Sequence, residues 1–175
     1  MSNRDRMPEL DIQIGLENGK WPSETELMVL ATRVLTAASH YLAREERQPF
    51  PPQPPELSLV FTDDEDIRAI NREWRGKDAP TNVLSFPAFP LEPGRMPGPM
   101  LGDIVVARET VGREAVDLDK SFEDHLTHLL VHGFLHLFGY DHMETDEAEK
   151  MESLETRILA MLGLSDPYAG QDPII

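Results

Sequence analysis

The chain is organised around a histidine-rich stretch, His132-Gly133-Phe134-Leu135-His136-Leu137-Phe138-Gly139-Tyr140-Asp141-His142. The run from Phe122 to Leu137 carries apolar residues at helical spacing, which predicts a helix capped by Ser121. His132 and His136 then lie one turn apart on the same face. Gly139 can adopt the positive φ angle that ends a helix, so the chain can turn and bring His142 back toward that face. The stretch therefore predicts a helix and following loop on which three imidazoles converge.

Three neutral imidazoles around one point suit a divalent metal of borderline softness, with a fourth position open for water. A pair of histidines four residues apart is weak evidence alone, because it is also typical of a half-buried helix face. The third histidine, beyond a helix-ending glycine, strengthens the prediction considerably. The chain has no cysteine, so thiolate ligands are excluded. We expect one Zn²⁺ per chain, bound by His132, His136 and His142, with nickel or cobalt as alternatives.

The same spacing is found in the metzincin protease pattern H-E-x-x-H-x-x-G-x-x-H, with one difference. Gly133 stands where those proteases carry their general-base glutamate. This argues against a peptidase of that type. It leaves a metal-activated water as the nucleophile, assisted by some other group.

Composition narrows the class of protein. The 175 residues predict a single domain, 1–175, and carry 32 acidic against 16 basic side chains, a net charge of −16. Neither a secretory signal nor an apolar run approaching the roughly 20 residues of a membrane helix is apparent. We expect a soluble cytoplasmic protein that binds neither membrane nor DNA. Such an acidic surface also means that any RNA contact must be local.

Local patterns predict four strands and five helices. The strands are expected at 10–16, 56–61, 83–86 and 101–107, and the helices at 23–41, 63–74, 108–116, 121–137 and 143–163. A proline-rich connector covers 49–55 and an irregular tail 166–175. Segregated strands and helices predict an α+β fold, a small mixed sheet of about four strands packed with about five helices.

Several charged and polar residues can be interpreted as either structural or functional. Arg68, Arg72, Arg75 and Lys77 form either a solvated helix face or a local contact for a polyanion. His125 and His128 precede His132 on roughly the same face, where core or surface roles are favoured over supporting or ligating the metal. On the helix at 143–163, Ile158 belongs to an apolar stripe, and a solvated outer face is expected for four acids, Glu147, Glu149, Glu152 and Glu155.

Taken together, the motifs resemble the YbeY family of bacterial metal-dependent endoribonucleases. The histidine stretch resembles that family's signature, and other family stretches follow in the right order. These are Asn71-x-x-x-Arg75-Gly76-Lys77-Asp78-x-Pro80-Thr81-Asn82-Val83-Leu84-Ser85-Phe86-Pro87, Leu101-Gly102-Asp103-Ile104, Asp146-Glu147-Ala148-Glu149 and Asp166-Pro167-Tyr168. The resemblance extends from about Leu57 to Tyr168; the N-terminal third and the proline connector match only in outline.

The resemblance implies a function and a set of roles. His132, His136 and His142 would be the zinc ligands, and Arg75 the basic residue of the active-site cleft. The implied activity is cleavage of single-stranded RNA in maturation of the 3′ end of the small-subunit rRNA and in ribosome quality control, with the ribosome or its proteins as partners.

Chemistry suggests how the site residues would act. Arg75 and the metal, with His132, would stabilise the charge that develops on a phosphodiester during cleavage. Substrate contacts are expected from Arg72, Lys77, Asn82 and Ser85. Asp141 and His128 are candidates for orienting a metal ligand, although Asp141 has an equally plausible role in fixing its loop. The nucleophile is either water or the 2′-hydroxyl of the RNA.

Two other functions remain open from the residues alone. One is a zinc hydrolase acting on peptides or small amides, which the spacing favours and Gly133 opposes. The other is a non-catalytic zinc-containing ribosome assembly factor. A fourth protein ligand, such as His128, would favour the latter, because structural zinc sites are closed and catalytic sites keep an open position.

Overall fold

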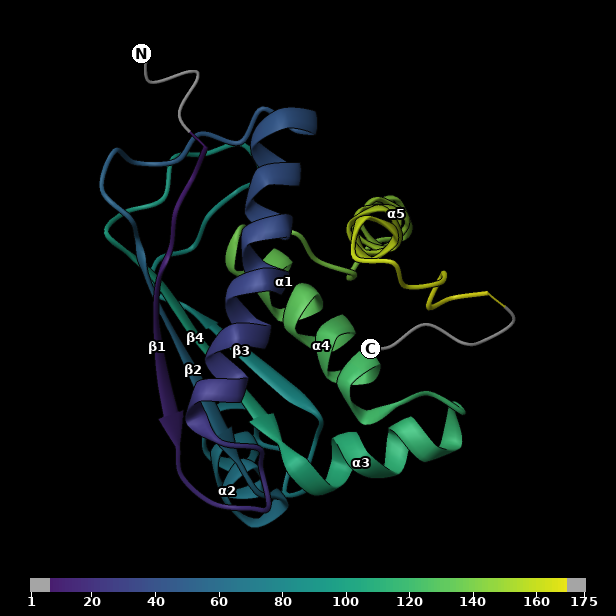
Figure 1. Cartoon of the computed structure of the whole chain (residues 1–175). Helices are drawn as coiled ribbons and strands as arrows, with labels where there is room; N and C mark the ends of the chain where they lie inside the picture. The colour runs from purple at the N-terminus through teal and green to yellow at the C-terminus, as the bar shows by residue number, and fades with distance from the viewer. Residues whose placement is uncertain (1–6, 170–175) are drawn as a thin grey trace.

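The computed structural model describes residues 7–169, which contain four strands and five helices (Figure 1). In chain order they are β1 (Asp11–Leu16), α1 (Glu24–Glu45), β2 (Glu56–Thr62), α2 (Asp64–Arg75), β3 (Val83–Pro87), β4 (Met100–Ala107), α3 (Arg108–Asp117), α4 (Phe122–Leu137) and α5 (Thr145–Met161). The predicted α+β class is confirmed. The predicted tail at 166–175 is a turn over 166–169, and its remainder, 170–175, lies outside the described residues.

The strands form one mixed sheet in the order β1-β2-β4-β3. β1 pairs with β2 and β2 with β4 in parallel, whereas β3 runs antiparallel to β4. The inner strands are the most apolar, because both of their faces are covered. β3 is an edge strand, and this position matters for the site described below.

Helices cover both faces of the sheet, and α4 is the most deeply placed of them. α1 and α4 lie together over one face and α2 over the other, while α5 packs against α4 and α1 (Figure 1). The main core lies between the sheet and α1, α4 and α5, and a smaller cluster around Ile67 and Leu84 lies under α2. Because α4 contacts strands and helices at once, most of its side chains are buried, including His125, His128 and His132.

Three helices begin directly after a residue that caps them, and one of these caps, Ser121, was predicted from the sequence. Ser23 and Glu26 form a complete capping box at α1, and Asp63 and Ser121 cap α2 and α4 through their side chains. α1 continues beyond its predicted end at Tyr41 to Glu45, since Tyr41 and Leu42 are still buried against the core. No helix within residues 7–169 is long and apolar enough to cross a membrane.

Trp74 departs from the helical pattern. Ile67, Ile70 and Trp74 recur at helical spacing along α2, and Ile67 is fully buried. Trp74, in contrast, is 68% exposed. Its ring packs against Phe86 of β3, and because β3 ends the sheet, no further strand among residues 7–169 covers the indole.

Candidate metal centre

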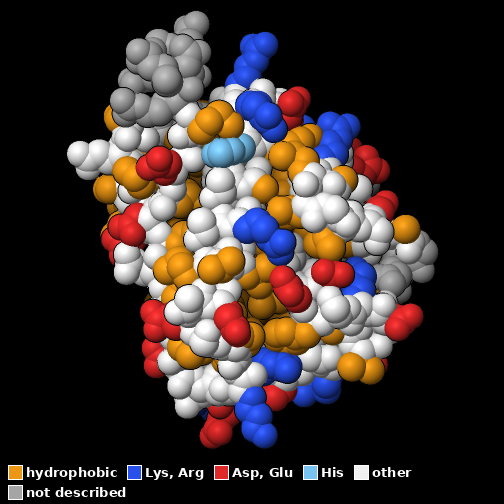
Figure 2. Space-filling view, viewed as in Figure 1, with side chains coloured by type: hydrophobic (Ala, Val, Ile, Leu, Met, Phe, Trp, Pro, Cys, Tyr) orange, Lys and Arg blue, Asp and Glu red, His pale blue; other side chains and the backbone are white. Residues whose placement is uncertain are grey.

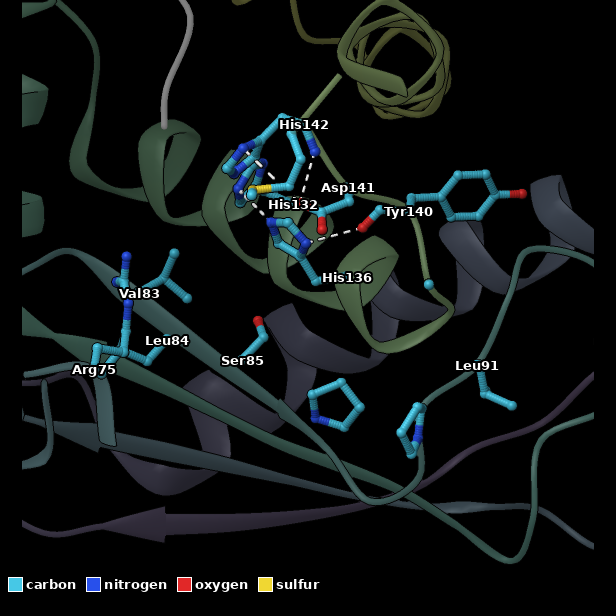
Figure 3. Close-up of a pocket in the computed structure, with 14 residues that line it drawn as sticks. Arg75, Val83, Leu84, Ser85, Leu91, His132, His136, Tyr140, Asp141 and His142 are labelled. Carbon is cyan, nitrogen blue, oxygen red and sulfur yellow. Dashed lines mark hydrogen bonds and ion pairs between the residues drawn. The ribbon is translucent and has the colours of Figure 1, made fainter. Parts of the chain in front are cut away.

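Three histidines converge at the end of α4. His132 and His136 come from the last turns of the helix and His142 from the loop that follows it (Figure 3). Their ligating nitrogens all lie within 4.8 Å of one another. The Nε2 atoms of His132 and His136 are 3.1 Å apart. This spacing fits two nitrogens on one metal at about 2.0–2.1 Å each.

Hydrogen bonds at the opposite ring nitrogens set the orientation of two of these imidazoles. The Nδ1 of His132 bonds to a carboxylate oxygen of Glu155, and the Nδ1 of His136 lies 2.9 Å from the carbonyl oxygen of Tyr140. Each Nδ1 therefore carries the proton, and each Nε2 presents a lone pair. Two lone pairs facing each other repel unless a proton or a cation lies between them, so the arrangement fits a metal ion.

The protonation of His136 supports the same interpretation. Burial, together with the neighbouring His132 and His142, lowers the pKa of His136 to about 4. The imidazole is consequently neutral at physiological pH, which is the form that binds a metal.

The return of His142 depends on Gly139. Its φ angle is +95°, the left-handed region predicted from the sequence. A Cβ at this position would also overlap the carbonyl oxygen of Leu91, in the loop after β3. The glycine thus allows the helix to end in the required direction and lets the loop after β3 pack against the turn.

The histidines form one wall of a cleft with a volume of about 440 Å³. The facing wall comes from α2, the edge strand β3 and the loop after it, with Arg75 and Ser85 both among the lining residues (Figure 3). Ser85 donates its hydroxyl to the carbonyl oxygen of Gly133 at 3.2 Å, which joins the two walls. A cationic side chain therefore faces a group of three imidazoles across a cavity of substrate size.

Glu155 is buried behind His132, which corrects the expectation that it lies on a solvated face. Its side chain is fully buried, and both of its oxygens have partners. The Nε2 of His128 lies 3.5 Å from one of these oxygens, and the hydroxyl of Tyr168 donates to it. Burial opposes ionisation, but the hydrogen bonds from His128 and His132 outweigh it and lower the pKa of Glu155 to about 2.

The sequence reasoning missed Glu155 and Tyr168 as supports of the site. A signal was present for Glu155, since it falls within the apolar stripe of α5, beside Leu154 and one turn before Ile158. A carboxylate at such a position is normally paired. His128, favoured as a core residue, is buried and also contacts this carboxylate.

The structure does not bring all the candidate substrate-binding residues to the cleft. Asn82 is buried, donates to Glu114 of α3 at 2.9 Å and accepts from the backbone of Val83, so it is committed to the start of β3. Arg72 is exposed on α2, and Lys77 in the turn that follows. Of these four candidates, Ser85 lines the cleft, as does Arg75, the basic residue predicted for the active site.

Asp141 holds its own loop. Its carboxylate accepts from the backbone N–H of His142 at 2.7 Å and lies 4.0 Å from the Nδ1 of the same residue. The oxygens that orient His132 and His136 belong instead to Glu155 and Tyr140. Of the two roles considered for Asp141, the loop contact is the one with hydrogen-bond geometry.

Gly133 faces the sheet. A Cβ there would lie 2.9 Å from the hydroxyl of Ser85 and 3.1 Å from a methyl group of Ile104. Gly133 stands at the position that holds a glutamate in metzincins. Here the missing side chain allows α4 to pack closely against β3 and β4.

The surface is consistent with the composition. On the face seen in Figure 2, Lys and Arg side chains are scattered among Asp and Glu. Arg68 is paired with Asp78 at 2.8 Å, so its charge is not free to bind a polyanion as part of the basic cluster on α2.

Comparisons with known proteins show which family the chain belongs to. A family model described as Endoribonuclease YbeY matches residues 14–163. A protein named Endoribonuclease YbeY from Agrobacterium fabrum is 76% identical over 168 residues, which cover 96% of this chain and all of the relative. One of the same name from Rhizobium meliloti is 72% identical over 167 residues, covering 95% and 99% of the two chains.

Among solved structures, a Thermotoga maritima protein determined in solution has a TM-score of 0.53 at 24% identity and covers 93% of this chain and 97% of its own. That likeness concerns the fold alone. The family match and the high identity along almost the whole chain confirm the resemblance drawn from the motifs. The chain belongs to the endoribonuclease YbeY family.

Proposed function

We propose that this protein is a zinc-dependent endoribonuclease that cleaves single-stranded RNA. The observation that carries the proposal is the convergence of three imidazoles, two of them oriented by hydrogen bonds, opposite Arg75 in one cleft. The name shared by its relatives, Endoribonuclease YbeY, supports the substrate class.

His132, His136 and His142 would hold the metal. Within residues 7–169 this group contributes three ligands, and His128 is turned toward Glu155 rather than into it. Three protein ligands leave a position open, as in catalytic zinc sites, which favours the enzyme over the structural zinc protein. When bound, zinc would supply Lewis acidity toward water and a phosphoryl oxygen.

Arg75 would bind the scissile phosphate from the opposite wall. Its guanidinium offers a planar set of donors that matches two phosphate oxygens and remains charged throughout the reaction. The negative charge that builds on the non-bridging oxygens would thus meet a fixed cation. Ser85, on the same wall, is placed to contribute a hydroxyl, although it also bonds to Gly133.

The arrangement opposes the peptidase alternative. The close contact of Gly133 with Ile104 leaves no room for a glutamate base at that position. Peptide hydrolysis by the metzincin scheme would lack its proton acceptor.

We extend the proposal to the biological role that the family resemblance implies. The RNA would be the small-subunit rRNA, processed at its 3′ end and during ribosome quality control in the cytoplasm. A net charge of −16 disfavours tight binding to RNA in general, so targeting would depend on the ribosome or one of its proteins.

Metal content and cleavage should be measured on the same preparations. We expect wild-type protein, purified without a histidine tag, to contain one zinc by elemental analysis and to cleave a labelled single-stranded RNA. His136→Ala should lose both metal and cleavage. Arg75→Ala should keep the metal but cleave about 100- to 1000-fold more slowly, the usual cost of removing one donor to a developing oxyanion.

Arg33→Ala is the matched control, because Arg33 is an exposed arginine of α1. It should leave metal and rate unchanged. Wild-type protein without metal would contradict the metal centre. Metal-loaded protein that leaves RNA intact even in the presence of ribosomes would contradict the nuclease.

A further inference from the structure

Trp74 is a large apolar side chain exposed beside the cleft. It lies in the last turn of α2 and is 68% exposed, with its indole tilted against Phe86 at a centroid distance of 6.0 Å. Single exposed apolar residues are common on proteins, so exposure alone says little. The residues next to it in the sequence and on β3 suggest a function for this exposure.

The indole is linked to the cleft by two direct connections. Arg75, the next residue of α2, lines the cleft, and so does Ser85, which precedes Phe86 on β3. Successive side chains of a strand point to opposite faces, so Ser85 faces α4 and Phe86 faces α2. Since β3 is the edge strand, a chain leaving the cleft past Arg75 turns around the edge of the sheet and reaches Trp74.

The charges around the indole favour a polyanion. Arg72, Arg75 and Lys77 surround it in the sequence, and within residues 7–169 none of the three forms an ion pair. Arg68 is neutralised by Asp78, and Glu73 is the remaining acid of this turn. In a chain with twice as many acids as bases, three unpaired cations within three residues of an exposed ring in the sequence form a local group that is complementary to nucleic acid.

We propose that Trp74, supported by Phe86, is a stacking platform for a base of the single-stranded RNA that flanks the scissile phosphate, with Arg72 and Lys77 at adjacent phosphates. The inference rests on the proposed function and names a part of its substrate site. Stacking on an aromatic ring tolerates any base, and an aromatic ring among cations is the usual arrangement for single-stranded nucleic acid.

Binding of a single-stranded RNA whose riboses are 2′-O-methylated should be measured at low salt by fluorescence anisotropy. Metal-loaded wild type, Trp74→Ala and Trp74→Phe are compared, with Val116→Ala of the exposed α3 surface as the control. We expect Trp74→Ala to bind about 5- to 150-fold more weakly, the range reported for losing one stacked base. Trp74→Phe keeps a ring and should stay within about threefold of wild type.

Tryptophan emission supplies a second readout. The chain has two tryptophans, and Trp21 is packed against Phe61 and Phe122. RNA should therefore quench the emission of wild type but not that of Trp74→Phe. Equal RNA affinities for wild type and Trp74→Ala would overturn the inference. So would a Trp74→Ala variant that binds RNA normally but no longer associates with ribosomal particles, which would assign Trp74 to a protein partner.

Failure of the proposed function is distinguishable from failure of this inference. A wild-type protein that neither binds nor cleaves RNA contradicts both. A wild type that cleaves RNA with no dependence on Trp74 contradicts the stacking platform alone.

Discussion

Glu155 shows how one buried charge can organise a candidate metal site. It lies on α5, accepts from His132 and is itself held by Tyr168 and His128. A carboxylate behind a metal-binding imidazole fixes the ring and makes it a better ligand. The same residue ties the turn after α5 to the site, because it accepts from the hydroxyl of Tyr168. Burial beside this carboxylate strongly raises the pKa of that hydroxyl and keeps it a donor.

We predict that Glu155→Gln weakens metal binding by about 10- to 100-fold. Glutamine has the same shape and can still accept from His132, but it lacks the charge that makes the imidazole a stronger ligand. The metal Kd would be measured by competition with a chelating dye, alongside a denaturation curve. Glu149→Gln, an exposed acid on the same helix, is the control. Equal zinc affinities for wild type and Glu155→Gln would show that the carboxylate serves the fold and not the metal.

At the scale of elements, the end of α4 is joined to the loop after β3 through a glycine. Gly139 combines a positive φ angle with contact to the backbone of Leu91. The joint places His142 beside the helix and Leu91 at the rim of the cleft. The histidine helix and the edge strand are thus held in one arrangement by backbone contact as well as by the bond from Ser85 to Gly133.

Gly139→Ala is predicted to destabilise the fold more than Gly163→Ala. Both glycines have a positive φ angle, 95° and 81°, but a Cβ at Gly163 meets nothing within 4 Å. Gly163→Ala should therefore lower the free energy of unfolding only by the strain of placing alanine in a left-handed conformation, about 1–2 kcal/mol. Gly139→Ala adds a clash with backbone, which overpacking data put at about 1–3 kcal/mol more. Urea denaturation would measure both free energies of unfolding. Equal decreases for the two variants would contradict the close contact between Gly139 and the backbone of Leu91.

On the scale of the whole molecule, the negative net charge opposes binding of a negatively charged substrate at the proposed site. The protein carries 32 acidic and 16 basic side chains, yet its proposed substrate is a polyanion. The few unpaired cations near the cleft must therefore account for the electrostatic part of binding. Long-range attraction, which speeds the association of basic nucleic-acid-binding proteins, is not available to this one.

RNA binding should accordingly show a weak dependence on salt. Each phosphate contact to single-stranded RNA contributes a slope of about −0.7 in a plot of log K against log salt concentration, so three contacts give about −2. Arg72→Ala should reduce the slope by about 0.7. Arg68→Ala, which removes an already paired cation, should leave it nearly unchanged. A wild-type slope several times steeper would mean that a larger basic surface binds RNA.

The sequence by itself determined the features that depend on neighbours along the chain. Helical periodicity places His132 and His136 on one face, and a helix-ending glycine returns His142. The caps Ser23, Asp63 and Ser121 and the alternating strands followed from equally local rules. The α+β class was therefore predictable, and so was the convergence of the three histidines.

Only the tertiary structure decided which distant residues meet this trio. Glu155 was assigned to solvent although it falls within the apolar stripe of α5, because helical spacing does not show which residue would pair with a buried carboxylate; His132 of α4 is that partner. Asn82 was assigned to the cleft, but Glu114 of α3 holds it at the start of β3. Trp74 recurs with Ile67 and Ile70 at helical spacing, yet the sheet of the described residues ends at β3 and leaves it exposed. Each difference has the same physical cause: burial depends on packing between elements far apart in the chain, which local periodicity does not encode.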